Sequence, residues 1–403
     1  MSEVVVIGGG QSASQCLVSL RASDYKESIT IIAEEDHIPY QRPPLSKDYL
    51  FGKVGLERVH TKNRDFYKNN EIELILNKTV QNINRGKKAL KLNDGNIVNY
   101  GKLVIATGSR VRKLDVEGSE LSNIHYLRNI KDADNIRSLI QNKKNLVIVG
   151  AGYIGLEVAS VANQLGVKVS IIEMADRVMN RTVDPLISEY YQNLHTQNGV
   201  KIFLNSALES FGGKGSVSKV YCTNQEIDTD FVVVGAGILP NQELASEAGL
   251  KCENGIWVDE YCQTEDSDIY ACGDCTNHPN KILQTRLRLE SVHNAIEQGK
   301  TVASSILGEK NSYNQVPWFW SDQYDHKLQI VGISGDHDRT VKREAEDGKS
   351  FLLFYLKEDS LIAVDAVNNP KDFMVCKKLV ANRTKISSDN LLDASADLNE
   401  LLL

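Results

Sequence analysis

The sequence lacks a long hydrophobic run. Apolar runs such as Val4–Ile7 and Leu146–Val149 have the length of a strand, far short of the roughly 20 residues that span a membrane. The chain opens Met-Ser-Glu and reaches an apolar segment at Val4, without the basic and hydrophobic regions of a secretory signal. We therefore expect no membrane association and a cytoplasmic location.

An excess of positive charge is also missing. The 46 Lys and Arg residues are outnumbered by 53 Asp and Glu residues, which gives a net charge of −7. Nucleic-acid binding requires a basic surface, so we expect no nucleic-acid partner. The chain of 403 residues is 41% hydrophobic and 25% charged, which is typical of a globular protein with two or three domains.

Metal-binding patterns are absent as well. The eight histidines form no H-E-x-x-H motif, and no Cys/His spacing matches a zinc site. The seven cysteines are odd in number and scattered, which predicts reduced thiols rather than a disulfide framework. We expect no metal centre built by this chain.

What the sequence does contain is one unit that occurs twice. Val4–Ile7 runs directly into Gly8-Gly-Gly-Gln-Ser-Ala13, a helical pattern follows, and the strand Ile29–Ile32 leads to Glu34. Leu146–Val149 likewise runs into Gly150-Ala-Gly-Tyr-Ile-Gly155, and the next strand ends on Glu173. Between them, helical spacing places one apolar face at Ile154, Val158, Val161 and Leu165.

Strand, glycine turn, helix, strand and acid in this order predict a dinucleotide site. The first glycine permits the tight turn, the second lets a pyrophosphate approach the backbone, and the third position must be small for helix–strand packing. The helix N-terminus attracts the phosphates, and the acid accepts hydrogen bonds from a ribose. A carboxylate at Glu173 favours NADH over NADPH, because it repels a 2′-phosphate. These observations leave open which of the two sites holds FAD.

One segment decides between the sites. It follows the first acid and reads Ile38-Pro-Tyr-Gln-Arg-Pro-Pro-Leu-Ser-Lys47. This segment resembles the signature of the NADH-dependent ferredoxin reductases that serve bacterial oxygenases and cytochromes P450, a family related to apoptosis-inducing-factor-like flavoproteins and rubredoxin reductases. The resemblance covers nearly the whole chain and continues through Leu103–Gly108, Gly235–Asn241, Ile269–Asp274, Arg288–Val292 and Pro317–Gln323.

The resemblance implies FAD in the N-terminal site and NADH in the middle site. The residues that it assigns to FAD are Gly8, Gly10, Ala13, Glu34, Arg42, Lys47, Thr107, Gly108, Asp274 and Trp320. The residues that it assigns to NADH are Gly150, Gly152, Ile154, Gly155 and Glu173. Ala13 stands where many relatives have glycine, but it is still small enough for close packing.

Three residues are expected at the point of hydride transfer. The resemblance implies Lys47 and Trp320 beside the flavin and Glu157 close to the nicotinamide, and Lys47 and Glu157 are candidates for an ion pair. A lysine there can tune the flavin. The alternatives are a surface lysine after a Pro-Pro turn and a tryptophan that only fills the core. Cys272 and Cys275 form a C-x-x-C pair, which we interpret as small packing residues rather than a redox disulfide.

The implied fold is α/β and glutathione-reductase-like. It has two doubly wound dinucleotide-binding domains with three-stranded antiparallel flaps: an FAD domain at residues 1–108 and 242–316, and an NADH domain at 109–241. The residue pattern then predicts strands at Lys327–Gly332, Phe351–Leu356 and Leu361–Val367 and a helix at Pro370–Ala381. This order indicates a C-terminal α+β domain at 317–403, with a short amphipathic tail at Ala394–Leu403.

The implied function is transfer of hydride from NADH to FAD and of single electrons to a [2Fe–2S] ferredoxin, which feeds a cytochrome P450 or ring-hydroxylating dioxygenase. Candidate contacts to an acidic ferredoxin are Arg64, Arg286, Arg288, Lys342 and Arg343. Two alternatives stay open: another acceptor, such as a rubredoxin, a quinone or monodehydroascorbate, and an NADH-sensing interaction protein. Monomer and homodimer are equally compatible with the sequence.

Overall fold

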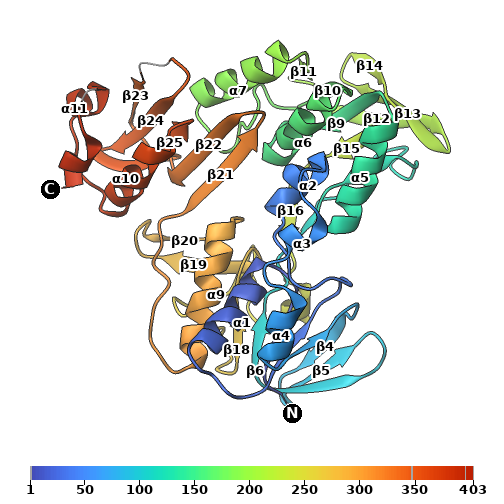
Figure 1. Cartoon of the computed structure of the whole chain (residues 1–403), viewed down its shortest axis with the longest axis vertical. Coiled ribbons are helices and arrows are strands. Elements are labelled where there is room, and N and C mark those ends of the chain that lie inside the picture. The colour runs from blue at the N-terminus through green and yellow to red at the C-terminus, as the bar shows by residue number, and fades with distance from the viewer. Residues whose placement is uncertain (1, 346–347, 395, 403) are drawn as a thin grey trace.

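Figure 1 shows the computed structural model, which describes residues 2–345, 348–394 and 396–402. Three groups of elements are visible: one around the N-terminal sheet, one around a second sheet coloured green, and a C-terminal sheet in orange and red. Helix α6 and strand β21 lie where the last two groups meet, with α2 close to α6.

The first sheet has seven strands in the order β3-β2-β1-β6-β5-β4, with β18 paired to β6. Its strands are β1 (Ser2–Ile7), β2 (Ile29–Ile32), β3 (Ile72–Ile75), β4 (Val80–Asn84), β5 (Ala89–Leu92), β6 (Ile97–Ile105) and β18 (Ile269–Ala271). Strands β1, β2, β3, β6 and β18 pair in parallel, whereas β4, β5 and β6 form an antiparallel flap. The strand that closes the parallel part therefore comes from much later in the chain.

Two helices pack on one another beside this sheet, α1 (Gln11–Ala22) and α9 (Val292–Ile306). Gly299 permits their close approach, because a Cβ on it would lie 2.7 Å from the Ser12 carbonyl oxygen. Shorter elements complete the group: α4 (Arg64–Asn69), α8 (Glu243–Glu247), β17 (Ile256–Trp257), β19 (Thr276–Asn280) and β20 (Thr285–Leu287). The segment η1 (Pro43–Ser46), α2 (Asp48–Phe51) and α3 (Leu56–Val59) instead packs against the helices of the second group.

The second sheet is parallel throughout, in the order β11-β10-β9-β15-β8. Its strands are β8 (Ile124–Tyr126), β9 (Asn145–Val149), β10 (Lys168–Ile172), β11 (Lys201–Phe203) and β15 (Phe231–Val234). The antiparallel flap beside it consists of β12 (Leu208–Lys214), β13 (Ser216–Cys222) and β14 (Gln225–Asp228). The helices of this group are α5 (Ile130–Asn142), α6 (Tyr153–Gln164) and α7 (Pro185–Gln197). The prediction of two doubly wound layers with antiparallel flaps is confirmed.

The predicted apolar face of α6 is partly wrong. Val158 and Val161 are buried, but Ile154 is 44% exposed and Leu165 lies 39% exposed at the end of the helix. Glu157, by contrast, is only 2% exposed. Ile154 and Leu165 lie at the two ends of the helix, where the packing stops, whereas Glu157 is buried because η1, α2 and β21 cover α6 on the side away from β9 and β10.

Strands β7 (Ser109–Val111) and β16 (Ile238–Pro240) form a short antiparallel ladder of their own. Ser109 is paired with Pro240, next to the predicted boundaries at 108/109 and 241/242. The chain therefore leaves the first group of elements and returns to it at adjacent points. The domain limits, including 316/317, remain predictions.

The C-terminal sheet is antiparallel, in the order β21-β22-β25-β24-β23. Its strands are β21 (Trp318–Gln323), β22 (His326–Gly332), β23 (Arg339–Glu344), β24 (Phe351–Lys357) and β25 (Ser360–Val367), and the helices are α10 (Pro370–Ala381), α11 (Ser388–Leu392) and η2 (Leu398–Leu402). The three predicted strands correspond to β22, β24 and β25, and the predicted helix is α10. The two edge strands, β21 and β23, were not predicted: the β21 segment was noted only as a motif, and the β23 sequence, Arg-Thr-Val-Lys-Arg-Glu, is mostly charged.

The predicted tail docks on the sheet. Leu398 is 2% exposed and packs in the apolar cluster under α10; residues 395 and 403 of the predicted segment lie outside the described residues. In the part of the chain that the structure describes, no helix is both long and apolar enough to cross a membrane.

Candidate functional site

The first glycine turn connects β1 to α1. Gly8 has φ +121°, and a Cβ on it would lie 2.2 Å from the Ala106 carbonyl oxygen, so only glycine fits. Around Gly10, in contrast, a Cβ would meet no heavy atom of the described residues within 4 Å. Ala13 is fully buried beneath the turn. The backbone at Gly10 is therefore open to a ligand, and the N–H groups that begin α1 are oriented to bind a phosphate.

Two arginines meet near this turn. Arg42 Nη1 donates to the Arg128 carbonyl oxygen at 2.6 Å, and Arg42 Nη2 donates to Glu35 Oε1 at 2.9 Å. Arg128 Nη2 donates to Ser109 Oγ at 2.9 Å and lies 3.4 Å from Asp274 Oδ2. Burial, and then the neighbouring charge of Arg42, lower the pKa of the Arg128 guanidinium. This pair brings predicted residues Arg42 and Asp274 together through Arg128, which was not predicted.

The Arg128 guanidinium provides a test of whether a dinucleotide fits here. Its Nε is buried and has no hydrogen-bond partner among the described residues. A buried charged donor without an acceptor is costly, and an anionic ligand relieves that cost. Together with the open backbone at Gly10, this unsatisfied donor fits the diphosphate of FAD.

Thr107 and Gly108 are held by Asn241, across the strands β7 and β16. Thr107 Oγ1 donates to the Asn241 carbonyl oxygen at 2.7 Å, and Asn241 Nδ2 donates to the Thr107 carbonyl oxygen at 2.9 Å. The Asn241 N–H donates to the Gly108 carbonyl oxygen at 2.9 Å. Glu34, directly beyond β2, is exposed, as a residue that binds a ribose must be.

The second glycine turn connects β9 to α6 and repeats the first. Gly150 has φ +99°, and a Cβ on it would lie 2.6 Å from the Gly235 carbonyl oxygen. No described heavy atom lies within 4 Å of a Cβ built on Gly152, whereas one on Gly155 would lie 2.2 Å from the Gly150 carbonyl oxygen. Ile154 presents its apolar side chain at the start of α6. This turn is a second open backbone site at a helix N-terminus.

Glu173 links the end of β10 to this turn. Its Oε2 accepts from the Ala151 N–H at 2.7 Å and its Oε1 from the Ala175 N–H at 2.9 Å. Each carboxylate oxygen has two lone pairs, so the bound carboxylate keeps acceptor capacity for a ribose diol. Arg177 donates to the carbonyl oxygens of Val183 and Asn180. Its guanidinium therefore binds backbone carbonyl oxygens and is not free to bind a 2′-phosphate.

Lys47 and Glu157 form the predicted ion pair. Lys47 Nζ lies 2.7 Å from Glu157 Oε2, with side-chain exposures of 17% and 2%. Ser46 Oγ donates to the same oxygen at 2.5 Å, and Ser321 Oγ donates to Glu157 Oε1 at 2.7 Å. Three segments, η1, α6 and β21, therefore meet at one carboxylate, and Lys47 is not a surface lysine.

Trp320 lies on the other face of β21. Side chains alternate along a strand, and Phe319 contacts Tyr153 of α6 at 4.4 Å between ring centroids, on the side of Ser321. The Trp320 ring lies 5.5 Å from that of Trp318. Trp318 in turn contacts α9 and α10. The structure thus brings Lys47 and Glu157 together and gives Trp320 a separate, aromatic environment.

The C-x-x-C pair is not a redox site in this structure. All seven cysteines, which lie within the described residues, are free thiols, and Cys272 and Cys275 are fully buried. Burial raises the pKa of both thiols, which opposes formation of the reactive thiolate. Within the described ranges, no group of three or more His, Cys, Asp or Glu side chains is arranged to hold a metal ion.

The candidate docking arginines are largely committed to the fold. Arg343 is 8% exposed and donates to the carbonyl oxygens of Ala394 and Ala396, so its proposed role in docking is wrong. Arg286 donates to the Val258 and Asn277 carbonyl oxygens and lies over the Trp257 ring at 3.6 Å.

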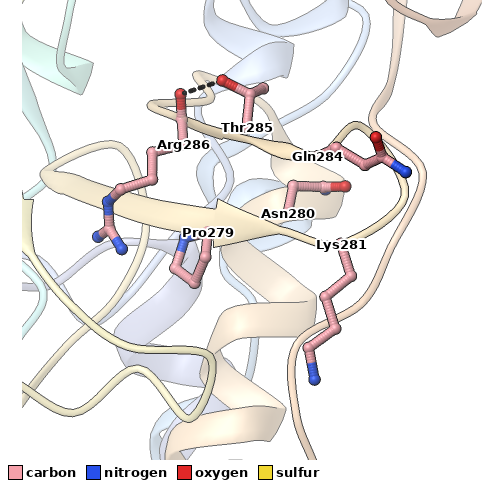
Figure 2. A pocket seen from close by; sticks show the side chains of 6 residues that line it. All are labelled: Pro279, Asn280, Lys281, Gln284, Thr285 and Arg286. Atoms are coloured by element: carbon pink, nitrogen blue, oxygen red, sulfur yellow. Dashed lines mark hydrogen bonds between the residues drawn. The ribbon is translucent and has the colours of Figure 1, made fainter.

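A hollow of about 430 Å³ lies at the β19–β20 hairpin, lined by Pro279, Asn280, Lys281, Gln284, Thr285 and Arg286. Figure 2 shows that the charged ends of Lys281 and Arg286 point to different sides of it. Two cations that diverge in this way do not form an anion site, and the hollow is separate from the glycine turns.

Comparison with known proteins agrees with this geometry. Residues 2–299 match the family described as pyridine nucleotide-disulphide oxidoreductase, and residues 318–402 match the reductase C-terminal family. The chain is 37% identical over 397 residues to rhodocoxin reductase of Rhodococcus erythropolis, which covers 98% of this chain and 93% of that protein. It is 38% identical over 370 residues to a rubredoxin-NAD(+) reductase of Pseudomonas putida, which covers 91% and 96%.

The solved structures give the same result. The chain matches the reductase in the covalent putidaredoxin reductase–putidaredoxin complex with a TM-score of 0.96 at 36% identity, over 100% of this chain and 98% of the other. The resemblance inferred from the sequence is confirmed. This chain belongs to the pyridine nucleotide-disulphide oxidoreductase family, and within it to the flavoprotein reductases of ferredoxins and rubredoxins.

Proposed function

We propose that this chain is an NADH:ferredoxin oxidoreductase. It takes a hydride from NADH at an FAD group and passes the electrons singly to a [2Fe–2S] ferredoxin that feeds a cytochrome P450 or another oxygenase. The observation that carries this proposal is the buried Lys47–Glu157 pair at the meeting point of η1, α6 and β21. The pair links the segment that follows the first glycine-turn unit, through the Lys47 ammonium group, to the helix of the second unit.

The chain's own residues bind and orient the two nucleotides. When bound, FAD supplies the conversion between two-electron transfer from NADH and one-electron transfer to an iron–sulfur acceptor. Gly10 and the start of α1 hold its diphosphate, with Arg128 as a charged donor. Asp274 accepts hydrogen bonds from its hydroxyl groups. Gly152 and Glu173 hold the diphosphate and the adenosine ribose of NADH.

The buried Glu157 carboxylate fixes the positive charge of Lys47. The Lys47 ammonium has three protons, and one of them is directed at Glu157 Oε2. The remaining donors are available to the flavin ring, where a fixed cation favours added negative charge. Because Glu157 is buried and receives three hydrogen bonds, this cation is held in place before the substrate binds, which is the arrangement that electrostatic catalysis requires.

Electron transfer to a ferredoxin is supported by two kinds of observation. The relatives named above act, by their names, on rhodocoxin and rubredoxin, and the solved neighbour is held in a complex with putidaredoxin. In this chain, Lys377 of α10 lies over the Trp318 ring at 4.5 Å, beside Trp320. A cation next to this aromatic pair suits an acidic partner.

A rubredoxin is the second candidate acceptor, favoured by the 38% identity to a rubredoxin-NAD(+) reductase. We also propose a cytoplasmic location, supported by seven free cysteines in the described residues, because reduced thiols are typical of a reducing compartment.

Anaerobic stopped-flow absorbance tests the function. The purified protein is expected to carry a flavin that NADH bleaches faster than NADPH does, and a [2Fe–2S] ferredoxin should then restore the flavin absorbance. Restoration by rubredoxin but by no ferredoxin would transfer the assignment to the second acceptor. Absence of a bound flavin, or a flavin that NADH does not bleach, would refute the proposal.

A further inference from the structure

A line of hydrogen bonds leads from Glu157 into the C-terminal sheet and ends on α7. Ser321 Oγ donates to Glu157 Oε1 at 2.7 Å, and Gln323 Nε2 donates to Ser321 Oγ at 3.2 Å. Gln323 Oε1 lies 2.9 Å from His195 Nε2. Glu157 belongs to α6, Ser321 and Gln323 to β21 and His195 to α7, so the line connects two helices of the second group through a strand of the C-terminal sheet.

All three bonds point in one direction. An amide oxygen only accepts, so the hydrogen between His195 and Gln323 belongs to His195 Nε2. The Ser321 hydroxyl accepts from Gln323 and therefore gives its single proton to Glu157. Each donor thus faces the carboxylate, and the three dipoles stabilise its negative charge.

The line is dry. His195, Ser321 and Gln323 are each 0% exposed, and Glu157 is 2% exposed. Burial lowers the pKa of His195 to about 4, so its ring is neutral at pH 7 with the proton on Nε2. Its Nδ1 is buried and has no partner in the part of the chain that the structure describes. In such surroundings a hydrogen bond is electrostatically stronger than in water.

We propose that His195, Gln323 and Ser321 are positioning residues for hydride transfer. They hold the Glu157 carboxylate in one orientation, and the carboxylate holds the Lys47 ammonium against the flavin ring. This inference rests on the proposed function. It assigns a role in the reaction to a histidine on α7 that makes no contact with the Lys47–Glu157 pair except through β21.

The test uses the FAD-loaded protein and three variants, Ser321→Ala, Gln323→Met and His195→Phe. Anaerobic stopped-flow with NADH gives the limiting rate of flavin bleaching and the dissociation constant of NADH. The limiting rate should fall about tenfold in Ser321→Ala, because small displacements of a reacting group are costly. It should fall less in Gln323→Met and least in His195→Phe, with the dissociation constant unchanged. The double variant His195→Phe/Gln323→Met should lose no more than Gln323→Met alone.

Two further variants distinguish a loss of positioning from a general loss of structure. His278 is also 0% exposed with a pKa lowered by burial to about 4, but it lies on β19, outside the line. His278→Phe should keep the wild-type limiting rate, and His195→Gln, which restores a donor to Gln323, should recover the rate that His195→Phe loses. Thermal unfolding of each variant identifies loss of folding. If Gln323→Met does not fold, Gln323→Leu, which also removes the donor without adding a charge, takes its place.

Nitrogen-15 NMR of the histidine rings supplies a readout that does not depend on turnover. The His195 resonance should show the Nε2–H tautomer in the wild type and lose that preference in Gln323→Met. If NADH does not bleach the wild-type flavin, the proposed function fails, and the NMR result still tests the line. If the wild type is bleached and Ser321→Ala and Gln323→Met match its limiting rate, or if His278→Phe loses as much as His195→Phe, the positioning role is refuted.

Discussion

The Lys47 ammonium and the Glu157 carboxylate lie 2.7 Å apart although 110 positions separate the two residues in the chain. Lys47 follows the 3₁₀ turn that begins with Pro43-Pro44, and Glu157 lies in the first turns of α6. Neither side chain is positioned by its own segment alone, because Ser46 and Ser321 contact the same carboxylate. The position of the Lys47–Glu157 pair therefore depends on tertiary packing and not on either local sequence.

Replacement of Glu157 should affect both folding and reaction. Glu157→Gln leaves the Lys47 ammonium half-desolvated without its counter-charge, and we expect a loss of about 2 kcal/mol in the free energy of unfolding. The rate of flavin bleaching by NADH should fall at least about tenfold. Urea unfolding and stopped-flow absorbance measure the two effects. Glu226→Gln, which removes an exposed partner of Lys219, should leave both at the wild-type value.

Replacement of Arg128 should weaken cofactor binding. Arg128→Met removes the buried donor and its contact to Asp274, and loss of one charge-assisted hydrogen bond corresponds to about a tenfold weaker binding of FAD. Fluorescence of released flavin measures the dissociation constant. Arg339→Met, on the exposed edge of the C-terminal sheet, serves as the control. Equal FAD affinity in Arg128→Met and the wild type would contradict the assigned role.

The choice between NADH and NADPH should depend on Glu173. Its carboxylate accepts from the Ala151 and Ala175 N–H groups and repels a 2′-phosphate. Glu173→Gln should therefore lower the ratio of kcat/KM for NADH to that for NADPH by about tenfold. An unchanged ratio would show that discrimination lies elsewhere. Asp176→Asn, three residues further along, tests whether any nearby negative charge has the same effect.

Stability should fall as the pH falls from about 6.5 to 4. Burial lowers the pKa of His195, His278 and His293 to about 4, so in this window these three residues bind protons only in the unfolded chain. Burial raises the pKa of Asp365 to about 7, so it binds its proton only in the folded chain and opposes them. For these four residues the difference of two protons corresponds to about 3 kcal/mol per pH unit, and the lowered pKa values of His60 and His125 act in the same direction.

Urea unfolding at pH 6.5, 5.5 and 4.5 checks this slope. Asp365→Asn removes the opposing group and should make the loss of stability steeper, whereas His278→Phe should make it shallower. A free energy of unfolding that stays level over this range would contradict the assigned protonation states.

Ferredoxin docking should depend on Lys377. Lys377→Gln removes the cation that lies over Trp318, so the association rate with an acidic [2Fe–2S] ferredoxin should fall and become less sensitive to salt. Stopped-flow reoxidation at two salt concentrations measures this effect, and bleaching by NADH should be unchanged. Lys214→Gln, an exposed lysine at the end of the flap strand β12, is the matched control; an equal decrease in both variants would indicate a general charge effect.

Much of the fold was predictable because its signals are local. The two glycine turns need only a run of neighbouring residues to specify strand, turn and helix, and Gly8 and Gly150 show the positive φ that such turns require. Strands with continuous apolar sequence, such as β24 and β25, were found for the same reason. A charged edge strand such as β23 gives no comparable pattern.

The site was less predictable where a residue acts through tertiary contacts. Arg128 lies outside every motif, and no local signal identifies it. Ser321 lies inside the Pro317–Gln323 motif, so the segment was found, but only its contact with Glu157 reveals its role. The apolar pattern of α6 placed Ile154 on the buried face of the helix, whereas the resemblance assigned it to the NADH turn, and its 44% exposure contradicts only the first expectation.

The ladder between Ser109 and Pro240 has a consequence for protein engineering. The segment that carries the second glycine turn begins and ends at neighbouring points, so it has the connectivity of a cassette that can be exchanged between related reductases without re-routing the chain. The exchange is limited wherever the cassette contacts its host, as Arg128 does with Asp274 and His195 with Gln323, and most of all at the Lys47–Glu157 pair. Glu157 belongs to the cassette, whereas Ser46, Lys47 and Ser321 belong to the host, so a working chimera must keep these four side chains matched.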